Sequence, residues 1–343
     1  MLPLALTIPE DSIFWPILRV AIVLLFILMI VPGIIYWERK LLAWFQDRVG
    51  PNRVGPFGLL QTIADGIKLF LKEDVNPAGV DKFIYLIAPA VALLPAFAIW
   101  GTIPWGPNPL LTPIADVDIG ILYVLAVSSM GVYGVFLAGW ASNNKYSLLG
   151  GLRAAAQMVS YEIPLTLSIV GAVVLAGTLS FSELIVWQRE HGWLLFWQPI
   201  GLGIFYISSL AEVNRTPFDM VEADSELVAG PYTEYSGMRF GFFFFAEYVA
   251  LFIMSGILVS LFFGGWLAPW PFPAQLDGFA GTLYGIFWFF LKTYTFVFIA
   301  VWLRATLPRV RVDQLMGMAW KVLLPLALVN LFVTAIAVVV FDL

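Results

Sequence analysis

The sequence predicts an all-α polytopic membrane protein that forms a single integral membrane domain. Of its 343 residues, 61% are apolar and only 12% are charged, against roughly 25% charged residues in an average soluble domain. The mean hydropathy of +0.89 agrees with this class. Long apolar runs fit helices, because a helix satisfies its own backbone hydrogen bonds in lipid and the period-2 alternation of a membrane barrel is absent.

The apolar runs that could cross about 30 Å of hydrocarbon predict about eight transmembrane helices. The first run follows Glu10 and Asp11 and lacks a small-residue cleavage motif, so it is expected to remain a span and not to act as a signal peptide. The fifth run contains Pro199, Gly201 and Gly203, which predict a broken or strongly tilted helix. The predicted spans are 13–37, 83–103, 119–140, 160–180, 195–211, 241–264, 283–303 and 320–341.

The Lys and Arg residues are distributed unevenly between the connecting segments. Of the 18 basic residues, 15 lie in the segments that follow spans one, three, five and seven. Because basic residues accumulate in cytoplasmic loops, these four segments are expected to face the cytoplasm and both termini to face outward.

The first of these segments contains a predicted amphipathic helix over residues 56–73. Its apolar residues recur at helical spacing, whereas Gln61, Asp65, Lys68 and Lys72 fall on the opposite face. One interpretation is a helix that lies in the membrane interface and carries an Asp65–Lys68 surface pair. The other is a helix that takes part in binding.

The end of the first span favours the second interpretation. Glu38 and Arg39 leave the membrane there, and Gly-Pro pairs at 50–51 and 55–56 predict a stiff turn that folds the amphipathic helix back beside them. The alternative interpretation is that these charged side chains at the helix end only extend to water. An apolar slot with ionisable groups at its end would suit an amphiphile with a long apolar tail and a polar head group.

The stretch AEVNRTPFDMVEADSELVAGPYTEYSG, residues 211–237, holds six carboxylates and one arginine. Asp219 and Glu222 fit a capping box, with Asp219 as the N-cap. Glu222 and Glu226 would lie one helical turn apart, where like charges repel. One interpretation is a solvated acidic cytoplasmic loop over 212–240, and the other is a set of proton carriers.

Carboxylates placed deeper in the predicted spans favour proton carriers. Glu162 stands at the start of the fourth predicted span, and Glu247 stands well inside the sixth. A carboxylate within a span costs about 2.5–3.5 kcal/mol on insertion scales, so it is a functional candidate. Glu212, at the end of the fifth span, could connect the two sets.

Several kinds of site are excluded by composition. Without cysteine, the chain can hold no thiolate-bound iron–sulfur cluster, and its single histidine, His191, argues against a bis-histidine haem. No glycine-rich phosphate loop is present. A formal charge of −5 argues against a nucleic-acid partner. If electrons are transferred, another subunit carries them.

Four segments taken together resemble a known family. They are ERKLLAWFQDRVGPNRVGPFGLLQTIADGIKLFLKE, GWASNNKYSLLGGLRAAAQMVSYE, AEVNRTPFDMVEADSELVAGPYTEYS and DQLMGMAWKVLLPL. They closely resemble the H-subunit family of NADH-quinone oxidoreductase, the quinone-channel membrane subunit of respiratory complex I. The resemblance covers nearly the whole chain in order.

The resemblance implies a subunit of a proton-translocating enzyme that is not catalytic alone. Quinone would be the substrate, this chain would bind no cofactor, and FMN and iron–sulfur clusters would reside in hydrophilic partner subunits. Neighbouring membrane-arm subunits and the lipid bilayer would complete its partners. The family's quinone cavity maps onto Glu38, Arg39, Arg48, Asp65 and Lys68. Its acidic path maps onto Glu162, Glu212, Asp219, Glu222, Asp224, Glu226, Glu234 and Glu247.

Two positions depart from the family pattern. Asp224 stands where many relatives have Glu, and Gly131 stands where many bacterial members have Glu. The chain is therefore expected to lack one acid of the path or to receive it from a neighbour. The absence of cysteine and the bacterial-looking ends of the chain favour a bacterial plasma membrane, with an organellar inner membrane as the alternative.

Two other functions remain open at this point. The same scaffold could serve a membrane-bound hydrogenase or a ferredoxin-linked complex, although the loop at 50–56 and the segment LQTIAD favour the quinone enzyme. A stand-alone secondary transporter could also bury acids on broken helices. Such a transporter is expected to show two related halves, and the sequence has no internal repeat.

Overall fold

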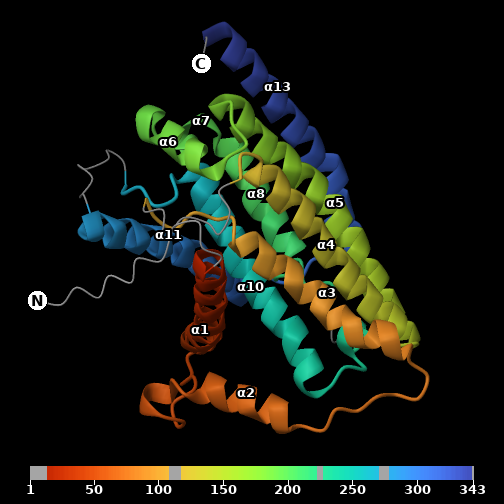
Figure 1. The fold of residues 1–343 in the computed structure, drawn as a ribbon. Coiled ribbons are helices and arrows are strands. Elements are labelled where there is room, and N and C mark those ends of the chain that lie inside the picture. The colour runs from red at the N-terminus through yellow and green to blue at the C-terminus, as the bar shows by residue number, and fades with distance from the viewer. Residues whose placement is uncertain (1–13, 108–116, 222–226, 270–277, 342–343) are drawn as a thin grey trace, which may run out of the picture.

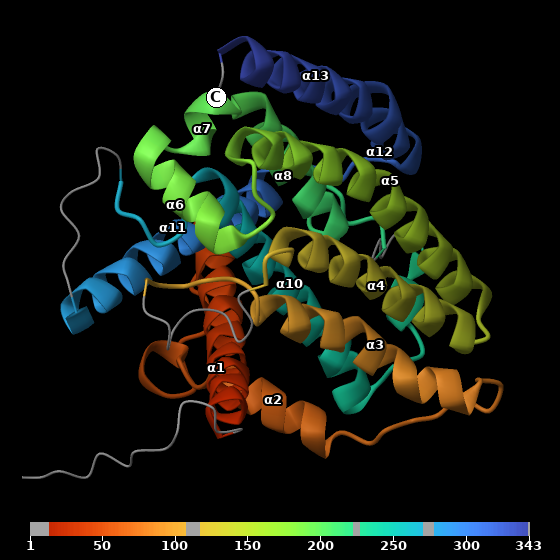
Figure 2. The same cartoon turned by 45° about the horizontal axis from the view of Figure 1, so that its top comes forward.

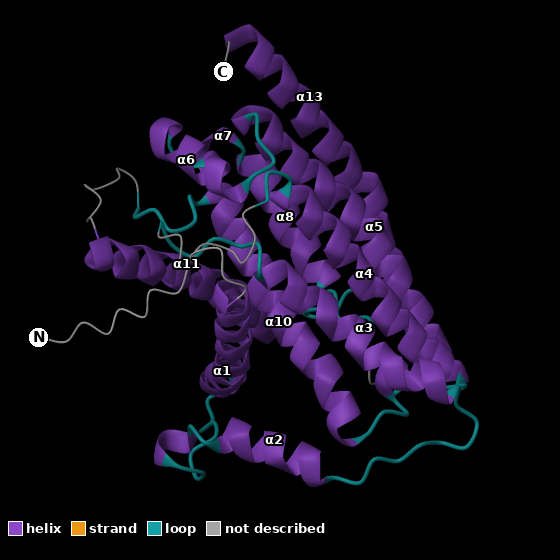
Figure 3. Cartoon of the chain, in the orientation of Figure 1, coloured by secondary structure: helices purple, strands orange, loops and turns teal. Residues whose placement is uncertain are grey.

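The computed structural model describes residues 14–107, 117–221, 227–269 and 278–341, and these residues form helices joined by loops (Figure 3). The N-terminal half holds α1 (Phe14–Phe45), α2 (Gln61–Leu71), α3 (Lys82–Trp100), α4 (Gly120–Ala141) and α5 (Lys145–Ala176). The C-terminal half holds α6 (Phe181–His191), α7 (Leu194–Trp197), α8 (Pro199–Glu212), α10 (Gly237–Phe262), α11 (Gly278–Thr306), α12 (Val312–Met318) and α13 (Leu324–Phe341). Two 3-10 turns, η1 (Pro56–Gly58) and η2 (Gly230–Tyr232), and a π segment, η3 (Ala319–Leu323), complete the described elements.

Several helices begin and end at residues that satisfy their free backbone groups. The Asp81 carboxylate accepts from two backbone N–H groups at the start of α3, and the Asn144 and Ser180 side chains each accept from one at the start of α5 and α6. Gly177 ends α5 in the left-handed conformation with φ of 68°. Local sequence therefore defines these boundaries.

The predicted fold class is confirmed, with a difference in the fifth span. Within the described ranges, 7 helices are long and apolar enough to cross a membrane, counting Val312–Phe341 as one. The remaining predicted crossing, the fifth span at residues 195–211, is divided at Gln198 into α7 and α8. At 14 residues, α8 is about 21 Å long, shorter than the hydrocarbon layer. Pro199 at its first turn accounts for the break.

The fourth predicted span belongs to a longer helix than the sequence suggested, because α5 already begins at Lys145. Small residues allow its first half to pack closely, with Gly150 against Gly230 and Gly139 of α4 against Ser147. Glu162 consequently lies near the middle of α5.

The helices surround α10. It is the most buried of the candidate spans, because 72% of the residues in its apolar stretch are buried. On one side α3, α4 and α5 are neighbours in that order, and α8 and α13 pack against α5 (Figures 1 and 2). At the opposite side α11 packs against α1 and α10. The short helix α2 lies across one end of this bundle, next to α1 and α10 (Figure 1).

Candidate functional site

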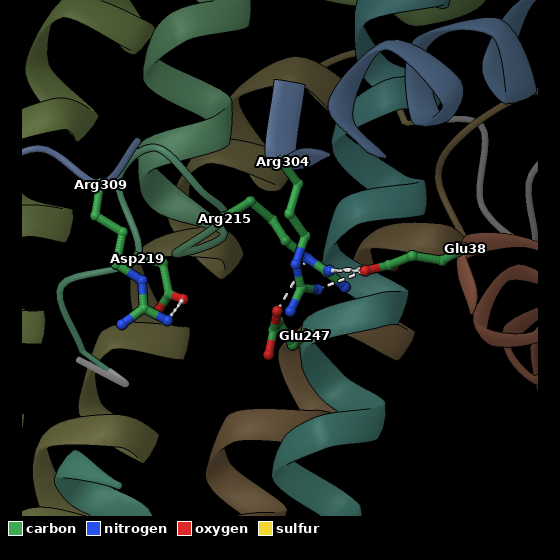
Figure 4. A network of polar contacts seen from close by, with 6 residues as sticks. All are labelled: Glu38, Arg215, Asp219, Glu247, Arg304 and Arg309. Atoms are coloured by element: carbon green, nitrogen blue, oxygen red, sulfur yellow. Dashed lines mark hydrogen bonds and ion pairs between the residues drawn. The ribbon is translucent and has the colours of Figure 1, made fainter. Parts of the chain in front are cut away.

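A buried arginine lies at the centre of the main ion cluster. Arg215, in the loop after α8, is 3% exposed. Its Nη1 donates to both carboxylate oxygens of Glu38 on α1, at 3.0 and 3.1 Å. Its Nε lies 2.9 Å from Oε1 of Glu247 on α10 (Figure 4). One guanidinium thus joins carboxylates from two spanning helices.

The charges of this cluster are balanced. Arg304, in the last turn of α11, also donates to Glu38, so two arginines face two glutamates (Figure 4). The centre of the Tyr248 ring lies 4.3 Å from the guanidinium carbon of Arg215. Burial opposes the charge of Arg215, but the carboxylates of Glu247 and Glu38 outweigh it and raise the pKa of Arg215. Arg215 therefore stays positively charged.

The loop that carries Arg215 is held by a buried amide. The Gln157 side chain on α5 donates to the Ala211 carbonyl and to the Phe218 carbonyl, both at 2.7 Å. Beyond it, Arg309 donates to Asp219 at 3.0 Å, which ties the same loop to the segment after α11 (Figure 4). Among the residues that the structure describes, Asp219 thus forms an ion pair with Arg309. Its predicted capping partner, Glu222, lies outside the described residues.

The predicted quinone residues fall into two groups. Arg39 of α1 pairs with Asp65 of α2, and Lys68 lies 3.9 Å from the same carboxylate. Arg48 is exposed in the loop just after α1. Glu38 faces the other way, into the Arg215 cluster, where it is only 2% exposed. Neighbouring positions on α1 thus serve different sites, because consecutive helical residues point about 100° apart.

Two of the predicted path acids line one cavity of about 100 Å³. Glu247 enters it from α10 and Glu212 from α8. The Oε2 atom of Glu212 is buried and has no hydrogen-bond partner among the described residues. Ser128 of α4 lies within reach of the Glu212 carboxylate, and Glu162 of α5 is close enough to repel it electrostatically. Two of the predicted acids therefore line this cavity, and Glu162 lies near one of them.

Gly131 lines the same cavity. A Cβ built at this position would meet no heavy atom within 4 Å. The place of the missing acid is therefore open space, and a volume of this size can hold several water molecules.

The remaining predicted acids are elsewhere or undescribed. Glu234 accepts a hydrogen bond from the Asn144 amide at 2.7 Å and does not line the cavity. Glu222, Asp224 and Glu226 lie outside the described residues. Across the described parts of the chain, no group of three or more His, Cys, Asp or Glu side chains could hold a metal ion.

Comparison with known proteins identifies the family. The model of the NADH dehydrogenase family matches residues 18–335. The H subunit of NADH-quinone oxidoreductase from Brevibacillus brevis is 51% identical over 94% of this chain and 93% of its own length. The corresponding proteins of Dehalococcoides mccartyi and Geobacter metallireducens are 49% and 48% identical, over 96% and 92% of this chain and 89% and 94% of their own lengths. The chain belongs to the H-subunit family of NADH-quinone oxidoreductase.

Family membership makes this chain a multi-pass membrane subunit of a bacterial-type complex I. Three arginines of the site were not predicted from the sequence: Arg215, Arg304 and Arg309. Arg215 had a signal, because it is the single cation among six carboxylates in residues 211–237. Arg304 and Arg309 follow a predicted span, and their partners are 266 and 90 positions away in the chain, so only the fold reveals them.

Proposed function

We propose that this chain helps to form the quinone-binding chamber and couples quinone reduction to proton translocation through buried carboxylates. One observation supports this most directly. Arg215 contacts Glu38, next to Arg39 on α1, and Glu247, which lines the acidic cavity. A charge change near Glu38 would thus act on Glu247 through Arg215.

The quinone end would be formed by Arg39, Asp65, Lys68 and Arg48. The Arg39–Asp65 pair joins α1 to the polar face of α2, where side-chain exposures of 42% and 25% leave both groups accessible. Exposed apolar residues of the same helix, including Ile63 and Ile67, leave a surface for a lipid-soluble tail. Polar groups beside such a surface suit a quinone head group, which needs hydrogen bonds, and its apolar tail.

Coupling would begin when reduction places negative charge on the head group. That charge acts on the nearby cations and changes the proton affinity of carboxylates that share them. Arg215 pairs with both Glu38 and Glu247. If its ion pair with Glu38 weakens, the electrostatic environment of Glu247 therefore changes. The second terminal nitrogen of Arg215 has no hydrogen-bond partner among the described residues, so it is available to an acceptor that moves.

The proton path would run through the cavity between Glu247 and Glu212, and on to Glu162. Water in the open space at Gly131 would connect these acids in place of a carboxylate from α4. Asp219, Glu234 and the acids at 222, 224 and 226 would extend the path toward the quinone end.

The wider assembly follows from the family. The partners would be hydrophilic subunits that carry FMN and iron–sulfur clusters, and neighbouring membrane-arm subunits. The chain would lie in a bacterial plasma membrane, with the four basic loops in the cytoplasm and both termini outside. No cofactor would be bound by this chain itself.

The test compares two ion pairs in the intact complex. Asp65→Asn and Arg39→Ala are expected to cut NADH-driven quinone reduction severely. NADH oxidation by a small soluble acceptor, which takes electrons before they reach this site, is expected to survive. The matched control is Asp313→Asn, which removes an exposed partner of Arg311 at 3.0 Å. Such a surface pair contributes about 0–1 kcal/mol, so this control is expected to be silent.

Equal losses in both assays, in proportion to the amount of assembled complex, would make Arg39 and Asp65 structural. Normal rates of quinone reduction in both variants would contradict the assignment of the quinone site.

A further inference from the structure

Helix α2, which carries Asp65, has no buried core of its own. None of the residues in Gln61–Leu71 is buried. Phe70 and Leu71, near its end, are 70% and 82% exposed. A helix of 11 residues without a fully buried side chain gains little from hydrophobic packing within the chain, which is the main source of helical stability in proteins. Its position must depend on a few specific contacts.

The first contact lies on the Asp65 side of α2. There the Arg39–Asp65 ion pair joins the helix to α1. In the loop before it, the Tyr36 hydroxyl donates to the Phe57 carbonyl at 2.8 Å. These contacts attach the loop before α2 and its middle turn to α1. They do not fix the last turn of the helix.

The second contact is a close approach to the first turns of α10. A Cβ built on Gly241 would lie 3.1 Å from Leu69 Cδ1, and one built on Gly237 would lie 3.3 Å from the Lys72 carbonyl oxygen. The two glycines are four positions apart, so they share one face of α10. This face is flat where the end of α2 rests on it.

A polar clasp, formed by Asp74, Asn76, Ser236 and Arg239, then holds the segment after α2. Arg239 lies 2.9 Å from Asp74 and donates to Asn76. The backbone N–H of Val75 donates to the Ser236 hydroxyl at 3.0 Å. The Arg239 guanidinium also lies 5.2 Å from the centre of the Tyr85 ring on α3. One arginine thus ties this segment to both α10 and α3.

We propose that Arg239 is a positioning residue for quinone reduction, which acts by holding α2, and with it Asp65, against the body of the subunit. The inference rests on the proposed function, because it takes Asp65 as part of the quinone site. Arg239 itself contacts neither Asp65 nor the Arg215 cluster in the described structure. Its effect is mechanical, since it determines where the carboxylate of Asp65 stands relative to Arg39.

The clasp has a further consequence for coupling. Helix α2 rests on α1 and α10, which carry Glu38 and Glu247. A quinone head group that moves α2 therefore acts on the same two helices that Arg215 joins.

The experiment uses Arg239→Ala in the assembled complex with two measurements. Hydrogen exchange of residues 61–76 reports the position of α2 without any quinone. The KM and kcat for a short-chain quinone report the site. We expect exchange in this segment to rise several-fold and the quinone KM to rise several-fold, with most of kcat retained and with normal NADH oxidation by a soluble acceptor. Arg239→Lys keeps the cation and is expected to restore much of the KM.

The control is Arg189→Ala, which removes an exposed cation on α6 near the other end of the bundle and is expected to change neither measurement. If Arg239→Ala prevents assembly, Ser236→Ala removes one contact of the clasp and is measured in the same way. Unchanged exchange of residues 61–76 would overturn the clasp. Raised exchange with an unchanged KM would overturn its role in quinone reduction. The Asp65→Asn variant decides separately whether α2 bears the quinone site.

Discussion

The two regions that meet at Glu247 treat their carboxylates in opposite ways. On the side of α1 and α11, Glu38 and Glu247 face Arg215 and Arg304 at ion-pair distance. On the side of α4 and α8, Glu212 faces a cavity, and its Oε2 has no protein partner among the described residues. A paired buried carboxylate is fixed in charge and place by its cation, whereas an unpaired one depends on water and on proton exchange.

This difference separates two roles that composition alone cannot separate. In the proposed mechanism, the paired cluster would hold helices and transmit charge, and the cavity would be the place where a proton is bound and released. Glu247 belongs to both regions, because it pairs with Arg215 and also lines the cavity. The substitutions below test whether the two regions differ as the structure indicates.

The largest effect is expected from Arg215→Ala. It leaves Glu38 with one cation and Glu247 without its close ion-pair partner, and breaking a buried pair costs about 3–5 kcal/mol. We expect less assembled complex and a lower thermal stability, measured on purified membranes by native electrophoresis and thermal denaturation. Arg215→Lys keeps the charge but cannot replace the forked contact, so it is expected to restore stability only in part. A normal amount of stable complex with alanine would mean that the cluster does not hold the helices.

Glu212→Gln is expected to act on turnover and not on assembly. Glutamine preserves the shape and leaves no cation unpaired, because the described contacts of Glu212 include no ion pair. The loss of the titratable proton is expected to lower coupled quinone reduction about tenfold or more, against roughly 10²–10⁴-fold for a general acid or base at a reacting group. The rate of NADH-driven quinone reduction per assembled complex measures this effect. A loss of assembly equal to that of Arg215→Ala would remove the contrast between the two regions.

A second variant on this side tests the role of water. Gly131→Leu introduces no charge and meets open space, so the subunit is expected to assemble. If water bridges the acids, the leucine side chain displaces it and lowers the same rate. An unchanged rate would show that the proton does not pass this part of the cavity.

The smallest effect is expected from Glu234→Gln. The Glu234 Oε1 accepts from Asn144 at 2.7 Å, and glutamine keeps a carbonyl acceptor in its place. We expect a change in stability within about 0.5 kcal/mol. The rate is expected to fall less than with Glu212→Gln, because Glu234 does not line the cavity and would only extend the path. A fall in rate equal to that of Glu212→Gln would contradict this ranking of the two acids.

The sequence predicted the fold and part of the site for physical reasons. Apolar runs and basic loops report membrane spans, and the Gly-Pro turns bring Asp65 to Arg39 as expected. Pro199 predicted the break before α8. The length of α5 was missed, because the small residues in its first half act through packing and not through hydropathy.

The division of the acids into paired and unpaired groups could not be predicted. Glu38 meets Arg215 and Arg304 across 177 and 266 positions of the chain, and no local pattern reports such contacts. Gly131 was noticed as a departure from the family, but only the structure shows that its place is open space. Pairing and hydration are properties of the packed helices.

The most direct test of the proposed coupling is Glu247→Gln, assayed in the intact complex for quinone reduction, proton translocation and NADH oxidation by a soluble acceptor. Glutamine can still accept a hydrogen bond from Arg215 but carries neither the charge nor the proton. The account predicts an assembled complex that retains the soluble-acceptor rate and loses most of its quinone reduction together with proton translocation. Normal quinone reduction with normal proton translocation would contradict the claim that Glu247 joins the two regions, and so would a loss of all three activities in proportion to lost complex.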